Sequence, residues 1–334
     1  AGMTQNFNCP IALGLGSGAG YIGSHMVRLL VERGLGVVVF DDLSTGHREA
    51  VGEAPLVVGD IRDGAALDRA FGDDQIDAVM HFCAKSLVGE SMNEPLAYYD
   101  NNVAGTISLL QAMQRHGVEK LVFSSTAAVF GEPEAEFIEE SHPTRPVNPY
   151  GRSKLMVEQV LDDVCRASGL RAVSLRYFNA AGASLSGGIG ESHDPETHLI
   201  PNVLKSAAGD GPSLKVFGDD YGTPDGTCIR DYIHVDDLAR AHLAALDFMT
   251  GHDGFHAFNL GNGRGFSVLE VIRAAEKVTG REIPFETAGR RPGDPAVLVA
   301  ASDRAANRLG WRPEIADLET IIRSAWEWER SRAF

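Results

Sequence analysis

The chain has 334 residues, enough for one large or two modest domains with a sizeable core. Acidic residues outnumber basic ones by 46 to 30, and the formal net charge of −16 argues against nucleic acid or an anionic membrane as a partner. No apolar run reaches the roughly 18 residues that a transmembrane helix needs. The four cysteines lie far apart and the N-terminus lacks a signal-peptide pattern, so we expect reduced thiols in a cytoplasmic protein.

A glycine-rich turn follows the first apolar run of the sequence. The run begins at Ile11, and a pattern of helical period follows the turn and ends near Gly34. Gly18, Gly20 and Gly23 fit the spacing G-x-G-x-x-G between a strand and a helix. Such glycines let backbone N–H groups approach a pyrophosphate. Alone the motif is weak, because a glycine loop can also bind another phosphate or only turn tightly.

The next predicted strand strengthens the interpretation as a dinucleotide site. Residues 37–40 are apolar and lead into Asp41 and Asp42. An acidic side chain about 20 residues past the glycine turn binds the adenosine ribose of NAD. A carboxylate there repels a 2′-phosphate, so the pattern favours NAD over NADP.

Apolar strands and helical stretches then alternate. Strands are predicted at 56–58, 78–82, 121–125 and 172–177, and helices include 95–116 and 149–167. This alternation is typical of α/β proteins with a Rossmann-like, doubly wound parallel sheet, in which ligands bind at the carboxyl ends of the strands. We expect an NAD-binding domain at 8–180 and a smaller, interleaved, mainly substrate-binding region at 181–334, with a strand near 257–260 returning to the sheet.

Tyr150 and Lys154 lie four residues apart, just after Asn148 and Pro149. Asn is a favoured helix N-cap and Pro a favoured first helical residue, so both side chains are expected on one face of a helix. A nearby cation favours the phenolate, and lowering the phenol pKa by about three units needs about 4 kcal/mol. The alternative is a chance pair on a solvated helix.

Thr126 follows the strand at 121–125, where ligands are expected. With Tyr150 and Lys154 it supplies a hydroxyl, a phenol and a cation. This set suits removal of a proton from a secondary alcohol while hydride leaves for a nicotinamide. Alternatively, Thr126 is a strand-end hydroxyl that bonds to the backbone.

The chain resembles the extended short-chain dehydrogenase/reductases, and among them the UDP-glucose 4-epimerases, from about residue 10 to residue 330. The segments that carry the resemblance are Gly18–His25, His81-Phe82, Leu87–Ser91, Tyr98–Val103, Phe123–Ser125, Ser141–Pro149, Tyr150–Gln159, Leu175–Asn179, Arg230–Val235 and Arg290–Asp294. The resemblance implies interconversion of UDP-glucose and UDP-galactose by transient oxidation at C4 with tightly bound NAD. It also implies a homodimer formed through the helices near 95–116 and 150–167.

The resemblance assigns roles residue by residue. Tyr150 is implied as the base, Lys154 as the residue that tunes it, and Thr126 as the partner of the sugar hydroxyl. The implied cofactor residues are Gly18, Gly20, Tyr21, Ile22, Gly23, Asp41, Asp42, Asp60, Ile61, Phe82, Cys83, Ala84, Asn101, Ser124, Tyr150, Lys154, Tyr177 and Phe178. The implied substrate residues are Thr126, Asn179, His198, Leu199, Lys215, Val216, Phe217, Arg230, Arg291 and Asp294. Arg230 and Arg291 suit a diphosphate, because a guanidinium binds it in a bidentate manner.

Four positions depart from the family pattern. Ser17 stands where the first of three glycines is expected, which puts the pyrophosphate turn and the NAD affinity in doubt. Thr126 replaces the commoner Ser, and His198 stands where some members have Asn. Leu298 stands where some members have a Tyr beside the sugar, so UDP-GlcNAc is a possible second substrate.

Other functions remain open to different degrees. Dehydratases of this family carry an Asp-Glu pair after the Thr and decarboxylases a Glu, whereas Ala127 and Ala128 follow Thr126 here. A UDP-pentose or UDP-uronate 4-epimerase uses the same centre and stays an alternative. A non-catalytic NAD-binding protein would not need the intact Tyr150, Lys154 and Thr126. Residues 193–198 include metal-ligand types, but we expect a solvated loop there and no metal.

Overall fold

A computed structural model of the chain describes residues 11–15, 18–72, 76–209 and 213–334. Their packing divides the chain into two compact units, each made of three segments. Unit 1 contains the described residues up to Ser124 together with Asn148–Ser174 and His242–His256. Unit 2 contains Ser125–Val147, Leu175–Ala241 and Ala257–Phe334. The interleaving is finer than the single boundary near residue 180 that the sequence suggested. Ser17 and Cys9 lie outside the described residues.

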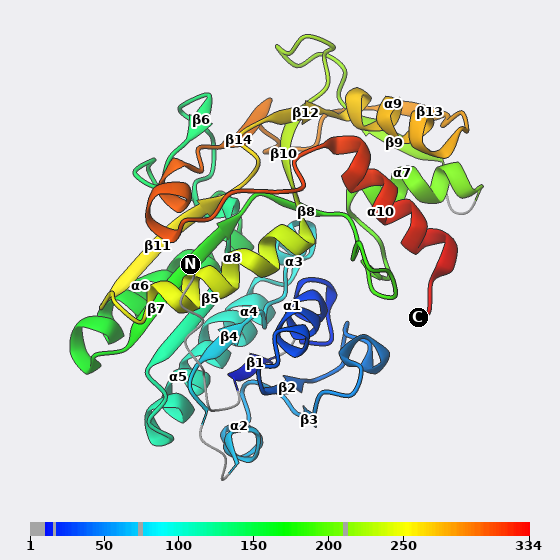
Figure 1. Cartoon of the computed structure of the whole chain (residues 1–334). Coiled ribbons are helices and arrows are strands. Elements are labelled where there is room, and N and C mark those ends of the chain that lie inside the picture. The colour runs from blue at the N-terminus through cyan, green and yellow to red at the C-terminus, as the bar shows by residue number, and fades with distance from the viewer. Residues whose placement is uncertain (1–10, 16–17, 73–75, 210–212) are drawn as a thin grey trace. The chain divides into compact units, whose positions relative to one another are not determined.

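A seven-stranded sheet forms the framework of the fold (Figure 1). Its order is β11-β7-β5-β4-β1-β2-β3, with β1 at Ile11–Leu15, β2 at Val37–Asp41, β3 at Leu56–Val58, β4 at Val79–His81, β5 at Lys120–Thr126, β7 at Arg171–Tyr177 and β11 at Phe255–Leu260. Strand β1 pairs in parallel with both β2 and β4. The strand order therefore reverses between β1 and β4, which is where doubly wound sheets bind ligands. The predicted fold class is confirmed.

The helices of unit 1 follow the predicted pattern with one difference. They are α1 (Tyr21–Glu32), η1 (Arg48–Val51), α2 (Gly64–Phe71), α3 (Val88–Asn93), α4 (Pro95–Tyr98), η2 (Tyr99–Ala104), α5 (Gly105–Arg115) and α6 (Pro149–Ser168), and α8 (Val235–Phe248) spans the boundary between the units. The single helix expected at 95–116 is divided, because η2 is a π-helical segment between α4 and α5. Apolar residues of β2, β4, β5, α2, α5 and α6 form the core, among them Phe40, Leu67, Val79, Leu109, Phe123 and Leu161.

Local sequence signals set both ends of α6. The Asn148 side chain accepts a hydrogen bond from the Gly151 N–H at 2.8 Å, and Pro149 is the first helical residue. Gly169 ends the helix at φ 73°, in the left-handed region that glycine adopts without strain. The predicted start of this helix is confirmed, and it places Tyr150 in the first turn and Lys154 one turn later.

Unit 2 combines small sheets with three packed helices. One sheet has the order β12-β10-β14-β6, where β12 is Gly265–Ser267, β10 is Ile229–His234, β14 is Val297–Ala300 and β6 is Phe137–Ile138, and β8 (Asn179–Ala181) also pairs with β10. A second sheet pairs β9 (Leu214–Phe217) with β13 (Phe285–Ala288). Helices α7 (Leu199–Ala208), α9 (Val268–Thr279) and α10 (Leu318–Ser331) pack on one another. The short helices η3 (Ala127–Val129) and η4 (Ala305–Leu309) complete this unit.

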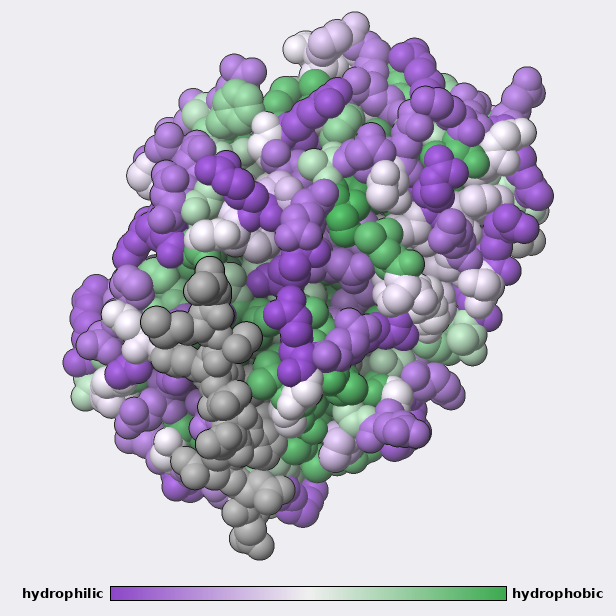
Figure 2. All heavy atoms as spheres, viewed as in Figure 1, coloured by the Kyte–Doolittle hydropathy of each residue, from purple (hydrophilic) through white to green (hydrophobic). Residues whose placement is uncertain are grey.

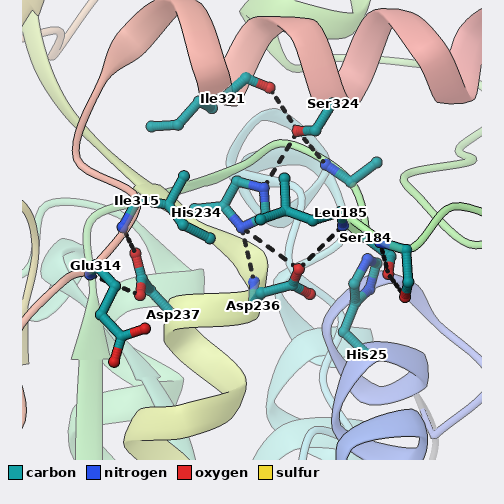
Figure 3. A network of polar contacts seen from close by, with 12 residues as sticks. His25, Ser184, Leu185, His234, Asp236, Asp237, Glu314, Ile315, Ile321 and Ser324 are labelled. Atoms are coloured by element: carbon teal, nitrogen blue, oxygen red, sulfur yellow. Dashed lines mark hydrogen bonds and ion pairs between the residues drawn. The ribbon is translucent and has the colours of Figure 1, made fainter.

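Buried acidic side chains join distant segments of unit 2 by accepting backbone hydrogen bonds. Asp231 in β10 accepts bonds from the N–H groups of Asn262, Gly263 and Ala300 at 2.7, 3.1 and 3.1 Å. Asp237, at the start of α8, accepts bonds from Glu314 and Ile315 (Figure 3). Each carboxylate thus satisfies backbone N–H groups of segments that lie far from it in the sequence.

One face of the molecule is mainly polar. Figure 2 shows this face, on which hydrophilic residues predominate and hydrophobic ones gather in smaller groups. This agrees with the large excess of acidic residues in the sequence. Within the described ranges, no helix combines the length and the apolar character that a membrane span requires.

Candidate active site

Helix α6 brings the ammonium group of Lys154 close to the ring of Tyr150. The Lys154 side chain is buried and its Nζ donates a hydrogen bond to the Ser124 carbonyl oxygen at 2.6 Å. The same Nζ lies 4.7 Å from the centre of the Phe123 ring and 6.0 Å from that of Tyr150. The structure therefore places the cation next to the phenol, at the carboxyl end of β5, as the four-residue spacing predicts.

Burial makes the charge of Lys154 sensitive to pH near neutrality. Desolvation lowers the pKa of Lys154 to about 7, although the nearby Cys83 and Glu158 oppose this effect. Glu158 is itself held in place, because the Ser174 hydroxyl donates to its carboxylate at 2.7 Å. The electrostatic support that Lys154 can give to a Tyr150 phenolate thus weakens above neutral pH.

A buried amide positions the start of α6. Asn102 donates from Nδ2 to the Ser153 hydroxyl at 2.9 Å and to the Lys85 carbonyl at 3.0 Å. Its Oδ1 accepts hydrogen bonds from the Lys85 N–H and from Asn101 Nδ2, both at 2.9 Å. Asn102 therefore links the predicted cofactor residue Asn101 to the helix that carries Tyr150. The sequence analysis did not single out Asn102, Lys85 or Ser153; Asn102 follows the predicted cofactor residue Asn101 within η2.

The glycine turn meets the end of β2 through Asp41. The buried Asp41 carboxylate accepts hydrogen bonds from the Ala19 N–H at 2.9 Å and from the Leu43 N–H at 2.8 Å. Burial raises the pKa of Asp41 although these two bonds act in the opposite direction. Helix α1 begins after Gly20, which has no side chain to cap it. The first N–H groups of α1 are therefore suited to a diphosphate, and Asp41 at the edge of this turn is suited to a ribose.

The other predicted cofactor residues of unit 1 end neighbouring strands or follow them. Ile61 follows β3 in the chain, Phe82 and Cys83 follow β4, and all three residues are buried. Asp60 forms an ion pair with Arg62 at 2.5 Å, and this pair lowers the pKa of Asp60. All predicted cofactor residues belong to unit 1 except Tyr177 and Phe178, which belong to unit 2.

Thr126 belongs to unit 2 and ends β5. Its Oγ1 accepts a hydrogen bond from the Ala128 N–H at 3.1 Å, so it caps the short helix η3. This is the backbone contact that the alternative interpretation of Thr126 predicts. A hydroxyl has one donor and two acceptor sites, so this bond leaves its O–H group able to donate to a ligand. Ala127 and Ala128 form the first residues of η3 and offer no acid or base.

The two arginines of unit 2 that are predicted to bind a diphosphate, Arg230 and Arg291, make different contacts within the protein. Arg230 donates to the Ile229 and Pro295 carbonyls, each at 2.8 Å, and to Asp294 at 3.1 Å. In contrast, the guanidinium of the exposed Arg291 lies over the Phe217 ring, 3.9 Å from its centre. Stacking leaves the edge N–H groups of a guanidinium directed outwards, which suits bidentate binding of an anion.

The remaining predicted substrate residues occupy strands β8 and β9 and the start of α7. Asn179 Nδ2 donates to the Asp231 carbonyl at 3.0 Å. In β9, Val216 is buried in the unit 2 core whereas Lys215 is exposed. Leu199 is the first residue of α7 and His198 its N-cap. Burial by itself lowers the pKa of His198, but the hydrogen bond to Glu191 outweighs this effect and the pKa rises to about 10.

Comparison with known proteins gives one consistent result. Residues 17–261 match the model of the NAD dependent epimerase/dehydratase family. A UDP-glucose 4-epimerase of Halalkalibacterium halodurans is 53% identical over 313 residues, which cover 94% of both chains. The structure of UDP-glucose 4-epimerase from Brucella ovis in complex with NAD is 49% identical, with a TM-score of 0.92 and coverage of 95% of this chain and 97% of that one. The enzyme from Stenotrophomonas maltophila, solved with NAD and formylated UDP-arabinopyranose, is 43% identical with a TM-score of 0.92, covering 97% and 98%.

The buried ammonium leads to a prediction on stability. The pKa of Lys154 falls from 10.5 to about 7 on folding, so between these values the unfolded chain binds more protons and stability rises with pH. In nucleotide-free protein, the free energy of unfolding should rise from pH 7 to pH 9 by about 2 kcal/mol more in the wild type than in Lys154→Met. Urea unfolding at the two pH values measures this difference.

The control is Lys277→Met, which removes a Lys whose side chain is 70% exposed and should keep the wild-type pH dependence. Equal pH dependence in Lys154→Met and the wild type would contradict the role of burial.

Proposed function

We propose that this chain, which belongs to the NAD dependent epimerase/dehydratase family, interconverts UDP-glucose and UDP-galactose with NAD as its cofactor. The observation that carries the proposal is the buried Lys154 ammonium beside Tyr150 on α6, near the carboxyl end of β5. Relatives that span 94% of the chain at about half identity are UDP-glucose 4-epimerases, which supports the choice of substrate.

The cofactor site is formed by the glycine turn and the ends of β2 to β5. The first N–H groups of α1 bind the diphosphate, and Asp41 accepts from the adenosine ribose. Lys154 binds the nicotinamide ribose, and Asn102 keeps Asn101 in place beside it. When bound, NAD would supply the hydride acceptor for oxidation at C4 of the hexose and the hydride donor for its reduction on the opposite face. Net redox change is zero, so the cofactor need not leave.

The chain's own residues carry the proton and orient the sugar. Tyr150 Oη takes the proton of the 4-hydroxyl and returns it after the sugar has turned over. Lys154 stabilises the phenolate electrostatically, and Thr126 donates its O–H to the same sugar hydroxyl. Because Ala127 and Ala128 provide no carboxylate, the oxidised sugar does not lose water. The centre is therefore restricted to reversible proton transfer at one carbinol.

Unit 2 provides the binding site for the nucleotide sugar. Arg291, presented by stacking on Phe217, binds the diphosphate through its outward N–H groups. Most N–H groups of Arg230 already donate to Asp294 and to two carbonyls, so its proposed role is mainly to hold Asp294 and Pro295 in place. The other substrate contacts are proposed to come from Asn179, His198, Leu199, Lys215, the Val216 backbone and Asp294.

N-acetylated UDP-sugars are a second proposed substrate class. Leu298 in β14 is the register partner of Arg230 in β10, so it lies beside a proposed substrate residue. A leucine is smaller than the tyrosine of some family members and leaves room for an acetamido group. UDP-pentoses stay an alternative, because the Stenotrophomonas maltophila enzyme was solved with formylated UDP-arabinopyranose, whereas UDP-uronates have no such support.

A cytoplasmic homodimer is the proposed form of the protein. Met92 on α3 is 60% exposed, Leu96 on α4 is 81% exposed and Met156 on α6 is 42% exposed. These helices contact one another within unit 1, so their apolar side chains are available for a helix-on-helix interface. The free thiols of Cys83, Cys165 and Cys228 are consistent with a reducing compartment.

Removing the Tyr150 hydroxyl tests the catalytic proposal. Tyr150→Phe should lower kcat by about 100- to 10,000-fold, because the base is lost, while NAD content and the circular dichroism spectrum stay unchanged. Turnover is measured with UDP-galactose, UDP-GalNAc, UDP-arabinose and UDP-galacturonate side by side, with product analysis. Tyr99→Phe removes a phenol elsewhere in unit 1 and should retain full activity. Near-normal turnover by Tyr150→Phe would refute its role, and preference for a pentose or uronate would refute the proposed substrate.

The size of residue 298 should control the second substrate class. Leu298→Tyr should lower kcat/KM for UDP-GalNAc at least tenfold while changing that for UDP-galactose less than threefold, because a larger ring excludes only the acetamido group. This tenfold change corresponds to about 1.4 kcal/mol. Leu298→Met, which conserves volume, serves as the control. Equal losses for both substrates would contradict a selective steric effect.

The proposed dimer makes a prediction about association. Leu96→Glu should place a charge in the apolar helix surface and shift the protein from dimer to monomer in light scattering coupled to gel filtration. Val31→Glu alters another exposed apolar residue, 56% exposed on α1, and should stay dimeric. A wild-type monomer, or a dimeric Leu96→Glu variant, would show that these helices do not form the interface.

A further inference from the structure

The loop between β8 and α7 gathers two histidines and two glutamates. Glu191, His193, Glu196 and His198 each offer one nitrogen or oxygen atom, and these atoms all lie within 4.8 Å of one another. Residues 193–198 were expected to form a solvated loop. The structure shows instead that Glu191 and the Glu196 side chain are buried, and it adds Glu191, which the sequence analysis did not include.

The nitrogen–oxygen distances in the cluster lie on both sides of the ligand spacing around one small cation. His193 Nδ1 lies 3.1 Å from Glu191 Oε1 and 3.8 Å from Glu196 Oε2. His198 Nδ1 lies 2.6 Å from Glu191 Oε1 and 3.3 Å from Glu196 Oε1. Ligands about 2.1 Å from a tetrahedral zinc ion lie about 3.4 Å from each other. A small adjustment of the side chains would therefore complete a four-ligand shell.

One ligand oxygen is buried without a hydrogen bond. Glu196 Oε1 accepts bonds from the N–H groups of Thr197 and His198, both at 2.8 Å. Within the described residues, Glu196 Oε2 is a buried oxygen with no hydrogen-bond partner, and the side chain is only 2% exposed. His193 Nδ1, at 3.8 Å, is within ion-pair range of this oxygen but does not form a hydrogen bond with it, so a closer cation would satisfy it better.

The loop is held in place by α7 and α10, so the four side chains belong to a supported site. Trp328 Nε1 donates to the Glu191 carbonyl at 2.8 Å, and a Cβ on Gly190 would lie only 2.4 Å from the Trp328 ring. Asn202 Nδ2 donates to the carbonyls of Glu196 and His198, at 3.3 and 2.9 Å. The exposed part of His198 leaves a path from solvent.

We propose that Glu191, His193, Glu196 and His198 bind one first-row divalent cation of the zinc type. Two imidazole nitrogens and two carboxylate oxygens suit Zn²⁺, whereas Mg²⁺ and Ca²⁺ prefer an all-oxygen shell. The two carboxylates neutralise the charge of the ion. The rival use of the cluster is a pair of protonated histidines bridged by glutamates, which needs no metal. Bound metal would link the loop to the first turn of α7, where His198 is also a proposed substrate residue.

Zinc binding by the NAD-containing protein tests the proposal. The protein is dialysed against a chelator and then against buffered Zn²⁺, and the bound metal is measured by inductively coupled plasma mass spectrometry. We expect one zinc per chain, which a hundredfold excess of Mg²⁺ does not displace. Glu191→Gln and His193→Asn should each bind at least tenfold more weakly. Co²⁺ in the wild type should give the intense visible absorption of a tetrahedral site.

The matched control removes two neighbouring histidines from unit 1. His252 and His256 have ring centres 6.2 Å apart, and the double variant His252→Asn/His256→Asn should bind zinc as the wild type does. His193→Asn decides the test if Glu191→Gln fails to fold, because the His193 side chain is partly exposed. Substoichiometric zinc in the wild type, or unchanged zinc in a folded His193→Asn, would overturn the metal site and favour the ion-pair cluster. Zinc content is measured separately from turnover, so either result leaves the test of the proposed reaction with Tyr150→Phe unchanged.

Discussion

The buried contact between the Lys154 ammonium and the Ser124 carbonyl is the constraint on which the proposed chemistry depends. It holds a cation at the end of β5 and beside the ring of Tyr150, where an unpaired charge would be costly. Helix α6 can maintain the contact because Asn148, Pro149 and Gly169 set its ends and Asn102 ties its first turn to the loop after β4. The position of one amino group thus depends on a helix cap and on a buried amide.

Burial has a consequence for how such a centre works. A lysine whose pKa lies near 7 can gain or lose its charge in response to small changes in its surroundings. An anionic partner nearby favours the charged form, and an empty apolar surrounding favours the neutral one. The pair of Tyr150 and Lys154 is therefore better described as a coupled acid–base unit than as a base with a fixed positive neighbour.

In unit 2, buried carboxylates have a structural role, whereas an exposed guanidinium remains available to a ligand. Asp231 and Asp237 are buried and satisfied by backbone N–H groups, so they act as fixed connectors between loops and strands. Burial raises the pKa of Asp231 to about 6 against the effect of those bonds. Arg291, in contrast, remains exposed over an aromatic ring and keeps its N–H groups for a ligand. The Glu–His cluster before α7 lies between these extremes, because two of its members are buried and two are partly open to solvent.

The sequence by itself determined the elements whose signals are local. The strand and helix periods, the cap at Asn148, the glycine turn and the four-residue spacing of Tyr150 and Lys154 all depend on residues close together in the chain. It also determined the family, since many motifs occur in one order. Only the tertiary structure decided which residues separated along the chain come into contact. These contacts join Lys154 with Ser124, Arg230 with Asp294, Asp231 with residues near 262 and 300, and Glu191 with His198. Burial is likewise a property of the assembled fold, so the lowered pKa of Lys154 and the buried Glu196 could not be predicted from residue type or spacing.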